Sequence, residues 1–417
     1  MAVLDIGVIG AGTAGAAAAI FLARAGHEVT VYERVPDPKP IGAGIVIQPT
    51  GLTVLARLGI AAEIIRRGAP IKRLRCTTST GKTVVDLDYA TVLPGWHGLG
   101  LHRGVLFQEL HRALKQEPRI ELVCGFAAED LASVRGRGGA KWIVDTDGRR
   151  HGPHDLIIVA DGAKSHLRDD TSVTKSVRPY AWGAMWHVAE DRERSFANDE
   201  LYQVVEGSQR MLGLLPTGLG PAPGATEPLV SVFWSIRGDL VDAWREDGLD
   251  AWRKEVARLV PHARPLLDDL DDANAITFAS YHDVVMDRWH TRSVVYIGDA
   301  AHAMSPQLGQ GCNLALYDAM VLADCIAATP HLPVALDLYS RARREHLDFY
   351  QLATRWLTPF FQSDVGVLAG LRDWFMGPFS RIPFVRREMV RSMTGTKTGI
   401  FAGALEVEHA SLLTDHA

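Results

Sequence analysis

Residues 4–33 read LDIGVIGAGTAGAAAAIFLARAGHEVTVYE, and this stretch decides the fold of the N-terminal part of the chain. Leu4 to Ile9 is a short apolar run, which is typical of a buried strand. A glycine-rich turn follows, then a helical stretch from about Thr13 to Ala25, and then a β-branched run from His27 to Tyr32. The order strand, turn, helix, strand predicts a βαβ unit.

The turn itself has the spacing Gly10-Ala-Gly12-Thr-Ala-Gly15. The first glycine permits a tight turn, the second lets the backbone approach a pyrophosphate, and the third lets the helix pack on the strand. Thr13 and Ala14 open the helix, whose free N–H groups and dipole attract phosphate. We therefore expect these five residues to bind a dinucleotide. The alternative is a glycine turn that serves only the fold.

Glu33 ends the second strand, where an acidic side chain accepts hydrogen bonds from a ribose 2′-hydroxyl. A carboxylate at this place disfavours a 2′-phosphate, so NADP is not expected in this site. FAD and NAD remain as candidates. Arg34, the next residue, is included among the expected cofactor contacts.

Composition bounds the other possibilities. The 417 residues favour two domains, and 47% hydrophobic with 22% charged residues is ordinary globular composition. A net charge of −5 gives no footprint for nucleic acid. The sixteen histidines form no HExxH pair and the four cysteines no CxxC pair, so we expect no metal and a reducing compartment. No apolar run is long enough to suggest a membrane span, and we expect a soluble, cytoplasmic protein.

Two later motifs separate FAD from NAD. Asp161-Gly162 follows the apolar strand 156–160, and Gly298-Asp299-Ala300-Ala301-His302 follows the strand 293–297 and continues into Pro306 and Gly309-Gln310-Gly311. An NAD dehydrogenase needs no second glycine-rich turn so far along the chain. FAD does, because its ribityl chain and ring extend well beyond the first helix. The motifs therefore favour FAD.

Taken in this order, the three motifs resemble the class A flavoprotein aromatic hydroxylases, the family of para-hydroxybenzoate hydroxylase, over about residues 1–345. The resemblance implies that Asp299 bonds the ribityl hydroxyls and that backbone near Ala300 meets the pyrophosphate. It also places Arg103 along the ribityl and pyrophosphate region. Asp161 is implied in the handling of FAD and NAD(P)H.

Further cofactor contacts are expected around the flavin ring. Gly309 and Gly311 precede a helix whose dipole can stabilise the anionic reduced flavin, and Asn313 lies at the start of that helix. A simple helix cap is the alternative. Gly44 and Ile45 belong to a glycine-rich segment, residues 41–51, which resembles the loop that lets the flavin swing in this family. It could also be only a flexible loop.

We predict an α/β fold of two intertwined domains. A Rossmann-like FAD-binding domain comprises residues 1–75, 99–178 and 286–345. A substrate domain with a mixed β-sheet comprises residues 76–98 and 179–285, where short strand-like runs recur and a helical insertion follows. Residues 346–417 form a helical C-terminal region, rich in aromatic side chains, that could cover the substrate pocket, mediate dimerisation or contact a membrane surface. Monomer and homodimer both remain open.

The resemblance implies a monooxygenase cycle in which NAD(P)H reduces FAD, O2 forms a flavin C4a-hydroperoxide, and one oxygen passes to an aromatic or heteroaromatic ring. A base that deprotonates the ring substrate would help. The candidates are His302, His187 and Tyr202, each of which could instead be structural. The expected substrate-binding residues are mostly apolar: Gln48, Met185, Gln203, Met211, Leu215, Trp234 and Pro306.

Three other functions remain to be distinguished from this one. A reductase or halogenase of the same fold is the first, although the WxWxIP segment of halogenases is absent and residues 233–236 are only superficially similar to it. An NAD dehydrogenase would leave residues 298–311 unexplained. A flavin-binding protein without monooxygenase activity is the third.

Overall fold

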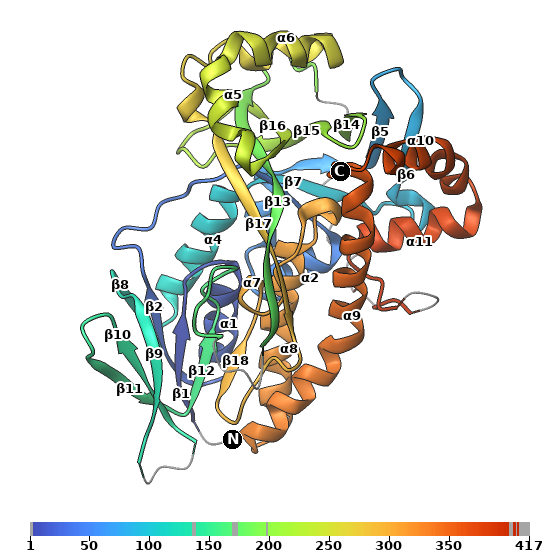
Figure 1. Cartoon of the computed structure of the whole chain (residues 1–417). Coiled ribbons are helices and arrows are strands. Elements are labelled where there is room, and N and C mark those ends of the chain that lie inside the picture. Colours follow the sequence, from blue (N-terminus) through green and yellow to red (C-terminus); the bar gives the residue numbers. More distant parts are fainter. Residues whose placement is uncertain are drawn as a thin grey trace.

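The computed structural model describes residues 3–135, 139–168, 174–196, 199–399, 403–405 and 407. Within these residues the strands form four sheets. Figure 1 shows the nucleotide-binding half, which carries the N-terminus, below the larger sheet with helices α5 (Val241–Asp247) and α6 (Leu249–Leu259). The C-terminal helices run along one side of both halves.

The first sheet is parallel and has the order β18-β12-β1-β2-β8. Its strands are β1 (Asp5–Ile9), β2 (Glu28–Glu33), β8 (Ile120–Cys124), β12 (Leu156–Val159) and β18 (Val294–Tyr296). Helix α1 (Thr13–Arg24) links β1 to β2, so the predicted βαβ unit is confirmed. Strands covered on both faces have apolar side chains throughout, as the fully buried strand β12 does.

Helices α1, α4 (Arg103–Gln116) and α8 (Gly311–Ala328) pack together beside this sheet. A small antiparallel sheet of β9 (Ala128–Ser133), β10 (Lys141–Asp145) and β11 (Arg150–His154) also contacts β1. Among the described helices, only α8 is long and apolar enough to cross a bilayer. It packs against α1, α2 (Pro49–Arg57) and α9 (Leu332–Phe361), which makes it a core helix of this fold.

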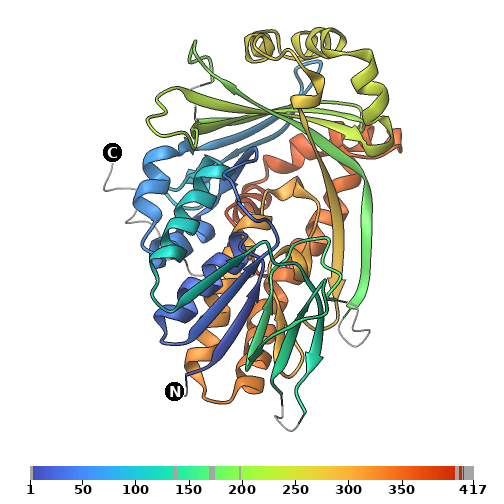
Figure 2. The ribbon, with the colours of Figure 1, turned by 90° about the vertical axis from the view of Figure 1, so that its left-hand side faces the viewer.

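The larger sheet is mixed and has the order β17-β13-β16-β15-β14-β5-β6. Its strands are β5 (Arg73–Thr78), β6 (Thr83–Asp88), β13 (Thr174–Glu190), β14 (Glu200–Glu206), β15 (Arg210–Leu219), β16 (Pro228–Arg237) and β17 (Thr277–Met286). Helices α5 (Val241–Asp247) and α6 (Leu249–Leu259) lie over one face. Figure 2 shows this sheet above the nucleotide-binding half.

Two further parts join the halves. Strands β3 (Gly44–Ile47), β7 (Gly98–His102) and β4 (Ala69–Ile71) form a small antiparallel sheet that contacts β15. Helices α9 (Leu332–Phe361), α10 (Gly366–Ser380) and α11 (Pro383–Met393) form the C-terminal part, with α10 and α11 packed on β6. The remaining helices are α3 (Ala61–Arg67) and α7 (Asp299–His302).

The local predictions were wrong where hydrogen bonds come from a strand that is distant in the sequence. Residues 41–51 were expected as a loop, yet they contain β3, which pairs with β7. The proposed domain boundary between residues 75 and 76 falls inside β5, because this strand pairs with β14 of the larger sheet.

Candidate active site

The first glycine-rich turn connects β1 to α1. Gly10 has φ +99°, and a Cβ there would lie 2.6 Å from the carbonyl oxygen of Ala160. A Cβ on Gly15 would lie 2.0 Å from the Gly10 oxygen, so both positions require glycine. A Cβ on Gly12 would meet nothing within 4 Å, which leaves open space at the start of α1. This is the arrangement that lets a pyrophosphate approach the helix N-terminus.

Glu33 is held beside this turn by two backbone groups. Ala11 N donates to its Oε2 at 2.9 Å, and Val35 N donates to its Oε1 at 2.8 Å. Carboxylate oxygens can each accept more than one hydrogen bond, so the side chain can still receive ribose hydroxyls. Arg34 beside it is exposed.

The second glycine-rich turn leads from β18 into α7 and is fixed from behind by α8. Gly298 has φ +60°, and its N–H donates to Oδ2 of Asp318 at 2.8 Å. His302 Nε2 lies 2.5 Å from the same oxygen, and Arg343 Nε donates to Oδ1 at 2.7 Å. Burial alone would raise the pKa of Asp318, but His302 and Arg343 hold this pKa well below its usual range. Asp318 and Arg343 form a fully buried ion pair.

Asp299 follows this turn and, unlike its neighbours, is exposed. It lines one end of a cavity together with Arg103, Gly309 and Gly311. Ala14 and Ala300 are buried, and a Cβ on Gly298 would lie only 2.9 Å from that of Ala14. Ala14 therefore packs α1 against this turn, and the Ala300 carbonyl accepts a hydrogen bond from Arg168 at 2.8 Å.

Asp161 lies two residues after the end of β12, between the two turns in the order of the sheet. Burial raises the pKa of this carboxyl, and its Oδ1 has no hydrogen-bond partner. An unsatisfied buried oxygen is costly unless a ligand completes it. The open space at Gly12, the free Asp161 oxygen and the exposed Asp299 carboxylate fit a long dinucleotide that bridges both turns.

Asn313 connects the start of α8 to β3. Its Oδ1 accepts from Gln48 N at 2.8 Å, and its Nδ2 donates to Val46 O at 3.0 Å and to Gly309 O at 3.2 Å. Gly44 and Ile45 lie in β3 and line the cavity, so this segment is a paired strand here. The amide of Asn313 thus positions the backbone around the cavity.

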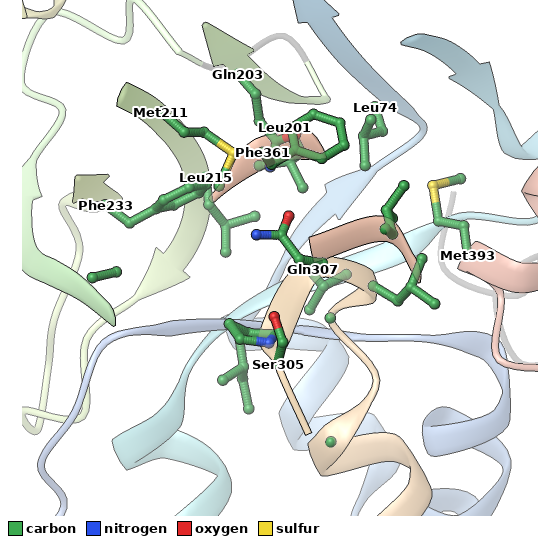
Figure 3. A pocket seen from close by; sticks show the side chains of 18 of the residues that line it. Leu74, Leu201, Gln203, Met211, Leu215, Phe233, Ser305, Gln307, Phe361 and Met393 are labelled. Atoms are coloured by element: carbon green, nitrogen blue, oxygen red, sulfur yellow. The ribbon is translucent and has the colours of Figure 1, made fainter. Parts of the chain in front are cut away.

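The cavity has a volume of about 600 Å³ and extends from the second turn to the C-terminal helices. Figure 3 shows Leu201, Gln203, Met211, Leu215 and Phe233 from the larger sheet, with Gln307 extending toward them from below and Phe361 and Met393 from the C-terminal helices. Most of its wall is apolar, as expected of a site for a small organic molecule.

Five of the expected substrate-binding residues line this cavity, and two do not. Gln48, Gln203, Met211, Leu215 and Pro306 are lining residues. Met185 and Trp234 are buried in the cluster beneath α6, where Trp234 packs edge-on against Trp252. Successive side chains of a strand point to opposite faces, so Ala184 and Trp186 face the cavity while Met185 faces away.

The same alternation removes two expected catalytic residues from the cavity. His187 Nε2 lies 3.1 Å from Leu266 O, and burial lowers its pKa. The Tyr202 hydroxyl bonds Thr77 Oγ1 at 3.0 Å, while Leu201 and Gln203 on either side line the cavity. His302 is buried behind the second turn on Asp318 and is not a lining residue either. His187, Tyr202 and His302 therefore pack behind the cavity wall and do not line the cavity.

Sequence reasoning missed several residues that line the cavity: Tyr89, Trp186, Phe233, Tyr281, Ser305, Gln307, Gln362, Met376, Met389 and Met393. Strict alternation along β13 and β16 could have found Trp186 and Phe233. No local pattern could have found the C-terminal residues, because they reach the cavity only when α9–α11 fold back over the larger sheet.

Fold and site together define a flavoprotein: a parallel nucleotide-binding sheet, two glycine-rich turns and an apolar chamber at their far end. The family model described as "FAD binding domain" matches residues 3–350, and the chain belongs to this family. It is an FAD-dependent aromatic hydroxylase of the class that resembles para-hydroxybenzoate hydroxylase.

Relatives agree with this assignment, and a solved structure shares the fold. The chain is 30% identical to 3-amino-4-hydroxybenzoate 2-monooxygenase of Streptomyces cremeus, over 83% of this chain and 88% of that protein. It is 27% identical to a probable 2-heptyl-3-hydroxy-4(1H)-quinolone synthase of Rhodococcus erythropolis, over 82% and 85%. PqsL of Pseudomonas aeruginosa, solved with 2-aminobenzoylacetate, shares the fold with a TM-score of 0.76 at 21% identity, covering 91% of this chain and all of that one.

Proposed function

We propose that the protein is a monooxygenase that uses NAD(P)H and O2 to hydroxylate an aromatic or heteroaromatic small molecule. One observation carries the proposal: the cavity that begins at Asp299, Arg103 and Gly311 continues without interruption into an apolar chamber under the larger sheet. A ring compound in that chamber would lie next to the part of the site where the flavin ring is expected. The small-molecule ring compounds in the names of the relatives support this class of substrate.

Bound FAD would supply the redox chemistry, namely hydride acceptance from reduced nicotinamide and activation of dioxygen. The residues that would hold it are the first turn with Glu33, the Asp161 carboxyl, Arg103, and Asp299 with Gly309–Gly311. The chain's own contribution is binding, orientation and the exclusion of water. The apolar wall performs the last of these, because a dry site suppresses loss of the activated oxygen as peroxide.

The described lining residues of the chamber include no histidine that could act as a base. Burial raises the pKa of the Tyr281 phenol to about 12, so Tyr281 stays protonated and can donate a hydrogen bond to a ring oxygen. The ring substrate must therefore be electron-rich by its own substituents. This requirement fits hydroxyl- or amino-substituted rings.

The test is NAD(P)H oxidation by the purified FAD-loaded protein, followed together with oxygen uptake and peroxide release across a panel of phenols and heteroaromatic compounds. We expect one group of ligands to accelerate oxidation with little peroxide and to yield a product heavier by one oxygen atom. Bound FAD with no ligand-stimulated oxidation would contradict the monooxygenase. It would favour a reductase or a flavin-binding protein instead.

A further inference from the structure

The half of the cavity far from the second turn carries no charged side chain among the described residues. Arg103 and Asp299 are the only Asp, Glu, Lys or Arg residues among the described lining residues, and both lie at the end where FAD is expected. The distant wall consists of apolar side chains from β5, β6 and α9–α11: Leu74, Val85, Leu87, Leu357, Met376, Met389 and Met393. Methionine side chains are flexible and fill around irregular apolar groups.

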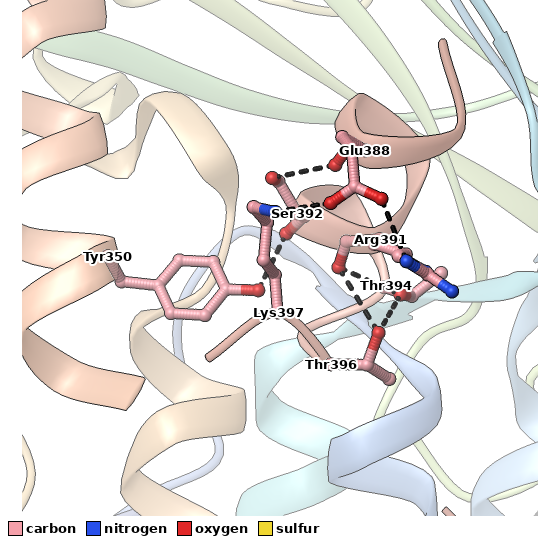
Figure 4. A network of polar contacts seen from close by, with 7 residues as sticks. All are labelled: Tyr350, Glu388, Arg391, Ser392, Thr394, Thr396 and Lys397. Carbon is pink, nitrogen blue, oxygen red and sulfur yellow. Dashed lines mark hydrogen bonds and ion pairs between the residues drawn. The ribbon is translucent and has the colours of Figure 1, made fainter. Parts of the chain in front are cut away.

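Cations behind this wall are already engaged. Lys397, only 3% exposed, forms an ion pair with Glu388, and Arg391 Nη1 contacts the other Glu388 oxygen at 2.8 Å (Figure 4). Figure 4 also shows the Tyr350 hydroxyl donating to Ser392 O, at 2.9 Å, which ties α11 to α9. This network holds α11 in place, and its two cations are paired with Glu388.

Arg372, which lies over the ring of the lining residue Phe361, is held by its own partners. Arg372 donates to the carbonyls of Gly207 and Phe360, each at 2.9 Å, and pairs with Asp373. Arg386 lies near Asp86 of β6. A carboxylate placed in the far half would lose its hydration without gaining a counter-ion, and burial of an unpaired charge is strongly unfavourable.

The chamber also has neutral polar groups, among them Ser305, Gln307 and Gln362. Ser305 is 3% exposed, lines the cavity, and its Oγ has no hydrogen-bond partner. Gln307 Nε2 donates to Gln362 Oε1 at 3.1 Å, and Figure 3 shows the Gln307 side chain directed into the space above Ser305. Neutral donors and acceptors recognise ring oxygen or nitrogen atoms, and they supply no counter-charge to an anion.

From these observations we infer that the substrate is an uncharged ring compound that carries an apolar substituent such as an alkyl chain. Its ring heteroatoms bond Ser305 and the Gln307–Gln362 pair, and its apolar substituent lies against the methionine-rich wall. This inference rests on the proposed function and names the substrate class for the same site. It distinguishes this chain's chamber from one built to hold an aromatic carboxylic acid.

The experiment compares three ligands with one ring: 4-hydroxyquinoline, its 2-heptyl derivative and its 2-carboxylate. Dissociation constants for the FAD-loaded protein are measured at neutral pH, without NAD(P)H, from the perturbation of the flavin spectrum. We expect the heptyl compound to bind at least tenfold more tightly than the parent, and the carboxylate at least tenfold more weakly than the heptyl compound. Failure of the heptyl compound to bind more tightly than the carboxylate overturns the inference.

Because this measurement needs no turnover, it separates the two proposals. Preferential binding of the heptyl compound without hydroxylation of any ligand contradicts the proposed function and leaves the inferred selectivity in place. Efficient hydroxylation of the carboxylate, together with its tight binding, supports the proposed function and contradicts the inferred selectivity.

A charge placed in the wall provides the second measurement. Met376→Arg introduces a cation into the far half, and Phe375→Arg places the same cation on the neighbouring residue of α10, which is 61% exposed and outside the cavity. We expect Met376→Arg to reverse the order of affinities, and Phe375→Arg to leave it unchanged, with FAD content confirming that each variant is folded. An unchanged order of affinities in a folded Met376→Arg variant would contradict the placement of the substituent.

Discussion

The backbone nitrogen of Gly298 donates a hydrogen bond to the Asp318 carboxylate at 2.8 Å, which joins the second glycine-rich turn to the middle of α8. Gly298 adopts φ +60°, a conformation that side chains other than glycine rarely adopt. The buried carboxylate therefore helps to hold the turn in the shape that presents Asp299 to the cavity. Arg343 and His302 keep this carboxylate ionised inside the core.

Replacement of Asp318 should destabilise the whole protein. Asp318→Asn leaves Arg343 charged and buried without its counter-ion, and we expect a loss of about 3–5 kcal/mol in the free energy of unfolding. The matched control is Asp324→Asn, on the same helix, where the carboxylate pairs with Arg57 at the surface and should contribute under about 1 kcal/mol. Denaturant unfolding of both variants gives the comparison, and equal losses would contradict the role of the buried pair.

Asp299 is expected to act on cofactor retention and not on stability, because its side chain is exposed. In Asp299→Ala a charge-assisted hydrogen bond to the ribityl chain is lost, worth about 1.5–3 kcal/mol. FAD should then bind roughly 10- to 100-fold more weakly. Titration of the apoprotein with FAD measures this, with Asp324→Ala as the control. Unchanged flavin occupancy would remove Asp299 from the site.

Stability should fall in mild acid because of His346. Burial and then the Arg343 charge lower its pKa from 6.5 to about 3, while the unfolded chain titrates near the ordinary value. Below pH 6.5 the unfolded state therefore binds a proton that the folded state does not, so stability decreases as the pH falls from about 6.5 toward 3. At pH 5 the loss amounts to about 2 kcal/mol relative to neutral pH.

The matched variant is His346→Gln, whose amide can accept from Arg343 and donate to Gly395 O as the neutral imidazole does. Unfolding free energies measured between pH 7 and 5 should show a shallower decline for this variant than for the natural protein. Parallel curves for the two proteins would show that His346 is not the group responsible.

Adjacent residues of β14 should differ in their effect on substrate. Gln203→Ala removes a polar group from the cavity wall and should raise KM by about fivefold, as the loss of one hydrogen bond would. Tyr202→Phe removes only the bond to Thr77 on the opposite face and should leave kcat and KM unchanged. Steady-state kinetics with any accepted ligand decides this. A large change in KM for Tyr202→Phe would mean that the sheet presents its other face to the substrate.

The nucleotide-binding half was predictable because its signals are local. The βαβ unit, the glycine spacing and Glu33 occupy thirty consecutive residues, and Gly10 and Gly15 meet a steric requirement that the neighbouring backbone imposes. Strand existence in the larger sheet was also predictable from apolar runs. Which face of β13, β14 and β16 meets the cavity was not, because a one-residue shift in a strand exchanges the two faces.

The sequence by itself thus determined the class of fold, the cofactor and the family, since these depend on short motifs whose geometry is fixed by adjacent residues. Tertiary structure alone decided the chamber. Ala184, Trp186 and Phe233 line the cavity, whereas Met185 and Trp234 face away from it. His302 contacts Asp318 behind the second turn. Met376, Met389 and Met393 of the C-terminal helices complete the wall. These contacts join segments far apart in the chain, and they form through packing that no local pattern of residues encodes.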